Sequence, residues 1–94
     1  MKIVEIIWID SIVEKLWRKH TVSIFEVEYV LKGKHQCRLV EKGNVKGEHV
    51  YSAAGRTADG RFLIVFYIVK RGGKALPISA RDMDKSERRI YGRA

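Results

Sequence analysis

Apolar residues recur with two different periods along the chain, and the change falls near residue 34. Before that point, two segments have the i, i+3, i+4 spacing of an amphipathic helix: Val13, Leu16 and Trp17, then Val27, Val30 and Leu31. After it, runs rich in β-branched and aromatic residues predict strands at 37–41, 49–54, 61–69 and 74–80. The opening run, residues 2–9, is also rich in β-branched residues and predicts one more strand.

The ends of the predicted helices are marked by short polar signals. Three pairs have the spacing of a capping box, in which a side-chain oxygen accepts a backbone N–H and a carboxylate reaches back: Ser11 with Glu14, Ser23 with Glu26, and Asp84 with Glu87. Gly33 is placed to end the second helix in a left-handed conformation, and the last helix should end near Tyr91. Only residues 21–22 separate the first two helices, so we expect a sharp corner there.

The predicted strands are joined by turn sequences. Residues 57–60 end in Asp-Gly, which is typical of a tight hairpin, and residues 70–73 form a second turn. Residues 62–69 are apolar on both faces and predict the central strand, whereas Pro77 places its own strand at an edge or a bulge. The chain therefore predicts an α+β fold in a single domain over residues 1–94. An N-terminal strand and two short helices pack on an antiparallel β-meander, which a short C-terminal helix closes.

Composition excludes several classes of protein. Hydrophobic residues make up 46% of the 94 residues and charged residues 32%, as in ordinary soluble domains. No apolar run approaches the roughly 18 residues of a membrane span, and Glu5 and Asp10 interrupt the only N-terminal stretch that could act as a signal peptide. We therefore expect a cytoplasmic protein without a metal site or cofactor. Cys37, Trp8 and Trp17 are expected in the core.

Charge is distributed unevenly along the chain. The formal net charge is +8; residues 1–55 hold nine basic and seven acidic residues, and residues 56–94 hold ten and four. Such an excess favours a polyanionic partner, RNA or DNA, with a merely solvated basic surface as the alternative.

Candidate chemistry lies in polar residues at the ends of elements: His20, Glu48, Arg56, Arg61 and Arg81. These residue types suit metal-free RNA cleavage, because an acid/base group must move protons and arginines stabilise charge on phosphate oxygens. Each has a structural alternative. His20 could cap its helix, Glu48 could pair with an arginine across the sheet, and Arg81 could pair with Asp82. Arg56 and Arg61 could be solvated arms of the hairpin.

The order of several short segments resembles the BrnT family of toxins. The matching segments are Trp8, residues 14–20, 22–23 and 26–27, 47–56, 60–63, 78–81, 87–88 and Tyr91. The resemblance implies a ribonuclease of a type II toxin–antitoxin system with a RelE-like fold, which inhibits translation and growth. It also implies neutralisation by a BrnA-like DNA-binding antitoxin, commonly as a 2:2 complex. Thr21 stands where the family commonly has glycine.

Carried over by position, the resemblance implies site residues at Lys19, His20, Glu48, Arg56, Arg61 and Arg81. We expect catalytic roles for His20, Glu48, Arg56 and Arg81, with either His20 or Glu48 moving protons. RNA contacts are expected from Lys19, Arg61, Lys85 and Arg88. Two alternatives remain: a non-catalytic basic RNA-binding module, and an inactivated toxin that only binds its antitoxin.

Overall fold

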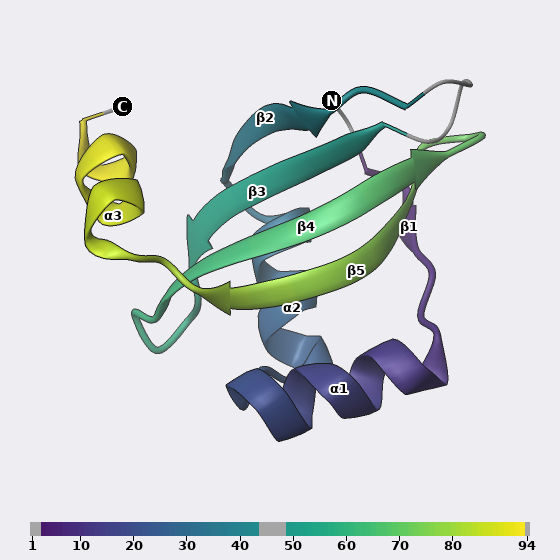
Figure 1. Cartoon of the computed structure of the whole chain (residues 1–94), viewed down its shortest axis with the longest axis horizontal. Helices are drawn as coiled ribbons and strands as arrows, with labels where there is room; N and C mark the ends of the chain where they lie inside the picture. The colour runs from purple at the N-terminus through teal and green to yellow at the C-terminus, as the bar shows by residue number, and fades with distance from the viewer. Residues whose placement is uncertain (1–2, 44–48, 94) are drawn as a thin grey trace.

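The computed structural model describes residues 3–43 and 49–93, in which five strands form one sheet and three helices pack around it (Figure 1). In chain order the elements are β1 (Glu5–Ile6), α1 (Asp10–His20), α2 (Ile24–Lys32), β2 (Gln36–Glu41), β3 (Val50–Arg56), β4 (Phe62–Lys70), β5 (Lys74–Asp82) and α3 (Lys85–Gly92). The strand order is β1-β5-β4-β3-β2. The predicted α+β class, the antiparallel meander of β2 to β5 and the central position of β4 are thus confirmed. Strand β1 is far shorter than predicted and pairs with β5 in parallel.

The two faces of the sheet have different surroundings. In Figure 1, α2 lies behind the sheet and α1 runs below it, whereas α3 stands apart at the left-hand end. Leu63, Val65 and Tyr67 of β4 are fully buried and join the core that α1 and α2 complete with Leu16 and Val27. Side chains alternate along a strand, so Phe62, Ile64 and Phe66 belong to the opposite side, which we call the open face.

Two of the three predicted capping boxes are confirmed. The Ser23 hydroxyl accepts the backbone N–H of Glu26 at 3.2 Å, and the Glu26 carboxylate accepts that of Ser23 at 3.0 Å. Asp84 and Glu87 make the same reciprocal pair at the start of α3. The box expected at Ser11 is wrong: α1 begins two residues earlier than that cap predicts, at Asp10, and its N-cap residue is Ile9, whose side chain makes no capping bond.

The residues that follow the two packed helices differ in backbone conformation: Thr21 is left-handed and Gly33 is not. Thr21, after α1, has φ 52°, a left-handed conformation that costs a β-branched residue more than it costs glycine. Gly33, after α2, has φ −95° and is not left-handed, so that prediction is wrong. A Cβ at Gly33 would lie 2.8 Å from the carbonyl oxygen of Tyr29, so close approach, and not φ, requires glycine there.

Three residues expected in the core lie elsewhere or only partly inside. Trp17 is 59% exposed, because the sheet-facing side of α1 is already occupied by Leu16 and Ile12. Trp8 packs against the core, and its indole N–H donates to the Glu28 carboxylate at 3.1 Å. Cys37 is exposed, because β2 is an edge strand.

Both predicted turns and the irregularity predicted at Pro77 are present. Gly60 has φ 87° in the hairpin between β3 and β4, and Gly72 and Gly73 have φ 81° and 78° before β5. The register between β4 and β5 shifts at Phe66 and Tyr67, opposite Pro77, so the predicted bulge is confirmed. Within residues 3–43 and 49–93, no helix is long and apolar enough to cross a bilayer.

Candidate functional site

Three strands each place one arginine on the open face of the sheet. Arg56 of β3 pairs with Phe62 of β4, and Arg81 of β5 pairs with Ile64, the next β4 residue on that face. Arg38 of β2 pairs with Ser52, which in turn pairs with Phe66. Because all these partners lie on the same side of the pleat, the three guanidinium groups surround one row of apolar β4 side chains.

Aromatic rings on this face are covered by guanidinium groups. The Phe62 ring is approached by the guanidinium of Arg56 at 4.6 Å and by that of Arg88, from α3, at 4.2 Å. The Arg81 guanidinium lies 5.5 Å from the centre of the Phe66 ring. Aromatic rings beside arginines are the combination with which proteins bind single-stranded nucleic acid, by base stacking and phosphate contact.

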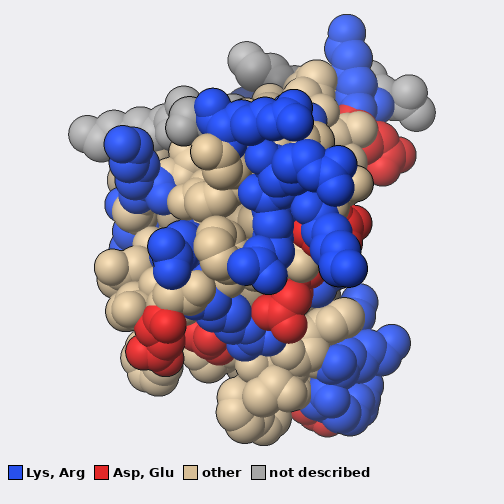
Figure 2. Space-filling model, turned by 90° about the vertical axis from the view of Figure 1, so that its left-hand side faces the viewer, with Lys and Arg blue, Asp and Glu red and all other residues tan. Residues whose placement is uncertain are grey.

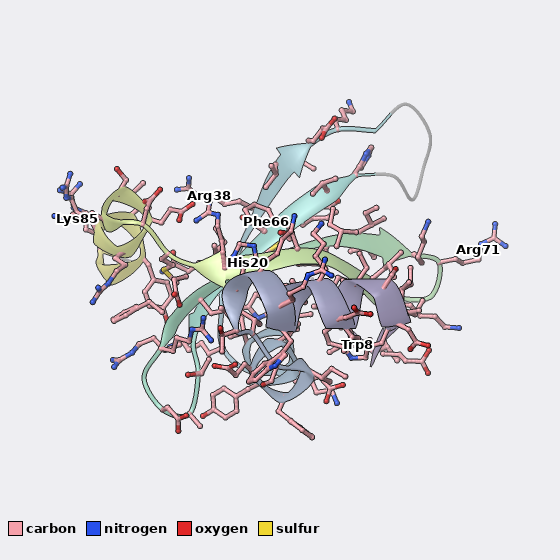
Figure 3. The ribbon with its side chains drawn as sticks, turned by 60° about the horizontal axis from the view of Figure 1, so that its bottom comes forward. Trp8, His20, Arg38, Phe66, Arg71 and Lys85 are labelled. Atoms are coloured by element: carbon pink, nitrogen blue, oxygen red, sulfur yellow. The ribbon has the colours of Figure 1, made fainter. Side chains whose placement is uncertain are left out.

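A pocket of about 370 Å³ lies where α3 meets the open face. Its lining includes Arg38, Ser52, Phe66, Arg81 and Glu87. In Figure 3, Arg38 and Phe66 lie in the same part of the view. The pocket therefore combines an apolar floor with cationic walls.

Arg81 is held in the pocket by a carboxylate from α3. Its guanidinium donates to both Glu87 oxygens, at 2.7 and 2.9 Å, and to the backbone oxygen of Asp82 at 3.1 Å. The hydrogen bond from Arg81 is the main reason that the pKa of Glu87 is lowered, and Glu87 raises the pKa of Arg81. The suggested Arg81–Asp82 ion pair is thus wrong, since Arg81 pairs with Glu87. A bidentate carboxylate occupies the same guanidinium edge that a phosphate would use.

Arg61 lies on the other side of the sheet, in a cluster that joins three elements. Its guanidinium donates to the Asp82 carboxylate at 2.6 Å, to Glu26 at 3.1 Å, and to the carbonyl oxygens of Thr21 and His20 at 2.8 and 2.9 Å. Asp82 is the main cause of the raised pKa of Arg61. Burial opposes ionisation of Glu26, but hydrogen bonds from Ser23 and Arg61 outweigh it and lower its pKa. Arg61 is therefore bound to the protein through most of its donors, and the alternative of a solvated hairpin arm is wrong.

The other predicted site residues are spread around this frame. His20 is the last residue of α1, and its backbone oxygen accepts a hydrogen bond from Arg61. Its side chain is half-buried (Figure 3). Lys19 is exposed beside it. Lys85 points outward from α3 in Figure 3. Glu48 lies outside the described residues.

Positive charge gathers on the side where α3 lies. Figure 2 faces that side and shows Lys and Arg over much of the surface, most densely in its upper half, with several Asp and Glu side chains beside and below them. Helix α3 alone supplies Lys85, Arg88 and Arg89. In the part of the chain that the structure describes, no three His, Cys, Asp or Glu side chains gather closely enough to hold a metal ion.

Four residues of this site were not predicted from the sequence: Arg38, Phe62, Phe66, and Glu87 in its role as the partner of Arg81. The alternation of Phe62, Ile64 and Phe66 could have indicated the binding face. Two helices cover one face of the central strand, and these three residues lie on its other face, which is left available for a ligand. Arg38 gave no signal, since its face depends on the register of an edge strand.

Comparison with known families gives one finding. The family model described as the ribonuclease toxin BrnT of type II toxin–antitoxin systems matches residues 8–87. A search of curated proteins returns no match.

Proposed function

The chain belongs to the BrnT family of ribonuclease toxins of type II toxin–antitoxin systems, and from that premise we propose that it cleaves RNA on the open face of its sheet. One observation carries this location. Guanidinium groups from β3, β5 and α3 lie over the rings of Phe62 and Phe66 there, next to a pocket of about 370 Å³ that Arg38 of β2 also lines. Single-stranded RNA can stack its bases on the guanidinium planes that cover these rings, while its phosphates contact the arginines.

The proposed chemistry needs no metal ion. The 2′-oxygen of one nucleotide attacks the adjacent phosphorus and loses its proton to a base, and the bond from phosphorus to the 5′-oxygen breaks as that oxygen gains a proton. The products are a 2′,3′-cyclic phosphate and a 5′-hydroxyl. Arginines near the phosphate favour this step because negative charge builds up on its free oxygens in the transition state.

The proposed residue roles follow from position. Arg81 and Arg56 bind and neutralise the scissile phosphate, and Arg81 exchanges Glu87 for a phosphate oxygen when RNA arrives. Arg88 contacts the RNA backbone beside Phe62. His20 or Glu48 moves the protons, and Lys19 and Lys85 add phosphate contacts at the edges of the site.

For Arg61 we propose a positioning role in place of RNA contact. Its bonds to the end of α1, to α2 and to β5 fix the helix corner that carries His20. A guanidinium already engaged by two carboxylates has little charge left to offer to a phosphate.

Membership of a type II family implies an antitoxin partner and an RNA target. We propose further that the antitoxin is a BrnA-like DNA-binding protein and that the two form a 2:2 complex. We also propose that the fold over residues 1–94 is RelE-like. The toxin would act on RNA in the cytoplasm and so inhibit translation and growth.

The test is the end chemistry of RNA cut by the purified chain. A synthetic single-stranded RNA is incubated with substoichiometric protein, with and without EDTA, and the product ends are identified by mass spectrometry. We expect turnover that EDTA leaves unchanged and fragments that end in 2′,3′-cyclic phosphate and 5′-hydroxyl. Loss of cleavage in EDTA, or fragments with 5′-phosphate ends, would overturn the proposed chemistry.

A further inference from the structure

Three large aromatic side chains are exposed together on the helical side of the molecule, away from the open face. Trp17 of α1 is 59% exposed, and Phe25 and Tyr29 of α2 are 81% and 55% exposed. All three line one hollow of about 530 Å³ beside the β3–β4 hairpin. We call these three residues the aromatic patch.

The aromatic patch makes little contribution to the core. Helix α2 packs on the sheet through Val27, Val30 and Leu31, which are buried. Phe25 and Tyr29 are four residues apart and form a second apolar strip on the outer side of the same helix, where an amphipathic helix normally carries polar residues. An exposed cluster of this kind marks an interaction surface.

Positive charge lies at one end of the patch. Phe25 and Tyr29 also line a second hollow, of about 590 Å³, together with Lys32, Lys34 and Arg56. Within the described residues, neither Lys34 nor Arg56 takes part in a salt bridge. A ligand that fills both hollows therefore needs apolar groups at the patch and a negative group at this end.

Charges of both signs surround the patch, which favours a protein ligand over RNA. Glu26 and Asp59 line the first hollow, and Glu28 lines the second. A phosphate backbone passing here would meet these carboxylates, whereas the open face carries four arginines. Trp, Tyr and Arg are also the residues that contribute most binding energy at protein–protein interfaces.

From these observations we infer that the aromatic patch is the docking surface for the antitoxin. The inference rests on the toxin–antitoxin function of the family. The docking segment of the antitoxin inserts apolar side chains beside Trp17, Phe25 and Tyr29, and places carboxylates against Lys34 and Arg56. Arg56 also lies over Phe62 on the open face, so a segment that reaches it competes with RNA at the edge of the proposed site.

The test compares two patch variants with a matched surface control. Phe25→Glu and Trp17→Ala alter the patch. The control, Val4→Glu, adds the same charge as Phe25→Glu outside the patch, at a residue that is 70% exposed. Glutamate in the first turn of α2 suits the helix dipole, so Phe25→Glu should fold normally. For each variant, the affinity for the purified cognate antitoxin is measured by calorimetry, and the RNase activity of the free chain is measured separately.

We expect Phe25→Glu and Trp17→Ala each to weaken antitoxin binding about thirty-fold or more, the effect of a hot-spot residue, with RNase activity unchanged. Val4→Glu should match the wild type in both assays. Wild-type antitoxin affinity in both patch variants would overturn the inference. Loss of RNA cleavage with antitoxin binding intact would identify the patch as an RNA surface and would also overturn it.

Two further readouts separate the remaining outcomes. If the wild type cuts no RNA but the patch variants still lose antitoxin binding, the docking surface stands and the proposed site fails. If light scattering shows a wild-type homodimer that Phe25→Glu converts to a monomer, the patch is covered by a second copy of this chain, and the antitoxin inference is overturned.

Discussion

Replacing Arg61 by alanine removes a side chain that hydrogen-bonds to the end of α1, to α2 and to β5. Its guanidinium contacts two carboxylates, Glu26 and Asp82, and two main-chain carbonyls at the end of α1. The Arg61 and Glu26 side chains are each only 23% exposed, so water replaces these contacts incompletely after truncation.

The size of the effect follows from the burial of each contact. A hydrogen bond to a charged group contributes roughly 1.5–3 kcal/mol when water is largely excluded. The Asp82 side chain is 65% exposed, so the Arg61–Asp82 ion pair adds less than about 1 kcal/mol to the stability. Water replaces part of the bonding to the carbonyls of His20 and Thr21. We therefore expect Arg61→Ala to lower the free energy of unfolding by about 3 kcal/mol, which is a fall in Tm of roughly 12–24 °C for a domain of this size.

The effect of the Arg61→Ala change should depend on pH in one direction. Glu26 and Asp82 have folded-state pKa values below their ordinary 4.5 and 3.8, with Arg61 contributing to both shifts. Their stabilisation is fully present above those ordinary values and is lost as pH falls through the lowered, folded values. The difference in stability between the wild type and Arg61→Ala should thus be largest near neutral pH and should shrink below about pH 4.

Urea unfolding followed by circular dichroism at pH 7 and pH 3.5 measures both effects. Arg18→Ala is the matched control, because Arg18 pairs with Glu14 at 3.7 Å on the surface, with side chains 66% and 76% exposed. We expect that control to lie within about 0.5 kcal/mol of the wild type. An Arg61→Ala protein that is as stable as the control, yet has lost RNA binding, would refute the positioning role and restore Arg61 as an RNA ligand.

Three further predictions concern single side chains. Thr21→Gly should stabilise the protein by about 0.5–1 kcal/mol, since it removes a left-handed conformation that costs roughly 1–2 kcal/mol and adds a smaller entropy cost; an unchanged or lower Tm in calorimetry would contradict this. Glu87→Gln should release Arg81 and tighten binding of single-stranded RNA in filter assays. The plot of log binding constant against log salt concentration should become steeper by about 0.7, and weaker binding would contradict this. Arg38→Ala should make that slope shallower by about 0.7 with little change in Tm, because Arg38 is exposed, whereas an unchanged slope would exclude Arg38 from the RNA site.

Much of the fold could be predicted because its signals are local. The capping boxes at Ser23 and Asp84 satisfy backbone groups within four residues, so the sequence of each box carries its own signal. The Asp-Gly hairpin and the apolar run of β4 are similar cases. The box at Ser11 failed because α1 begins at Asp10, so Ser11 is the second residue of the helix and does not occupy its cap position.

The site was harder to predict because it depends on which face each side chain takes. Arg61 and Phe62 are neighbours in sequence, yet Arg61 reaches α1 and α2 while Phe62 lies on the open face. Arg81 and Asp82 likewise lie on opposite sides, so the expected pair is replaced by Arg81–Glu87 and Arg61–Asp82. A shift of one residue in register exchanges these faces, and nothing local in the sequence fixes that register.

The exposure of Trp17 illustrates the same limit for helices. Its spacing from Val13 placed it on the apolar stripe, but only Leu16 of that stripe is fully buried. How much of a helix surface the sheet covers is a property of the tertiary structure. The aromatic residues left outside are the ones that we assign to the antitoxin.

The central claim, RNA cleavage at the arginines of the open face, is tested most directly by kcat/KM of Arg81→Ala on a single-stranded RNA. Arg71→Ala removes the same charge from an exposed turn at the far end of the sheet and serves as the control (Figure 3). We expect at least a hundred-fold loss for Arg81→Ala, the usual effect of removing a group that stabilises transition-state charge, and less than about a three-fold change for Arg71→Ala. Equal activity of the two variants, with both folded, would contradict the placement of the cleavage site on this face.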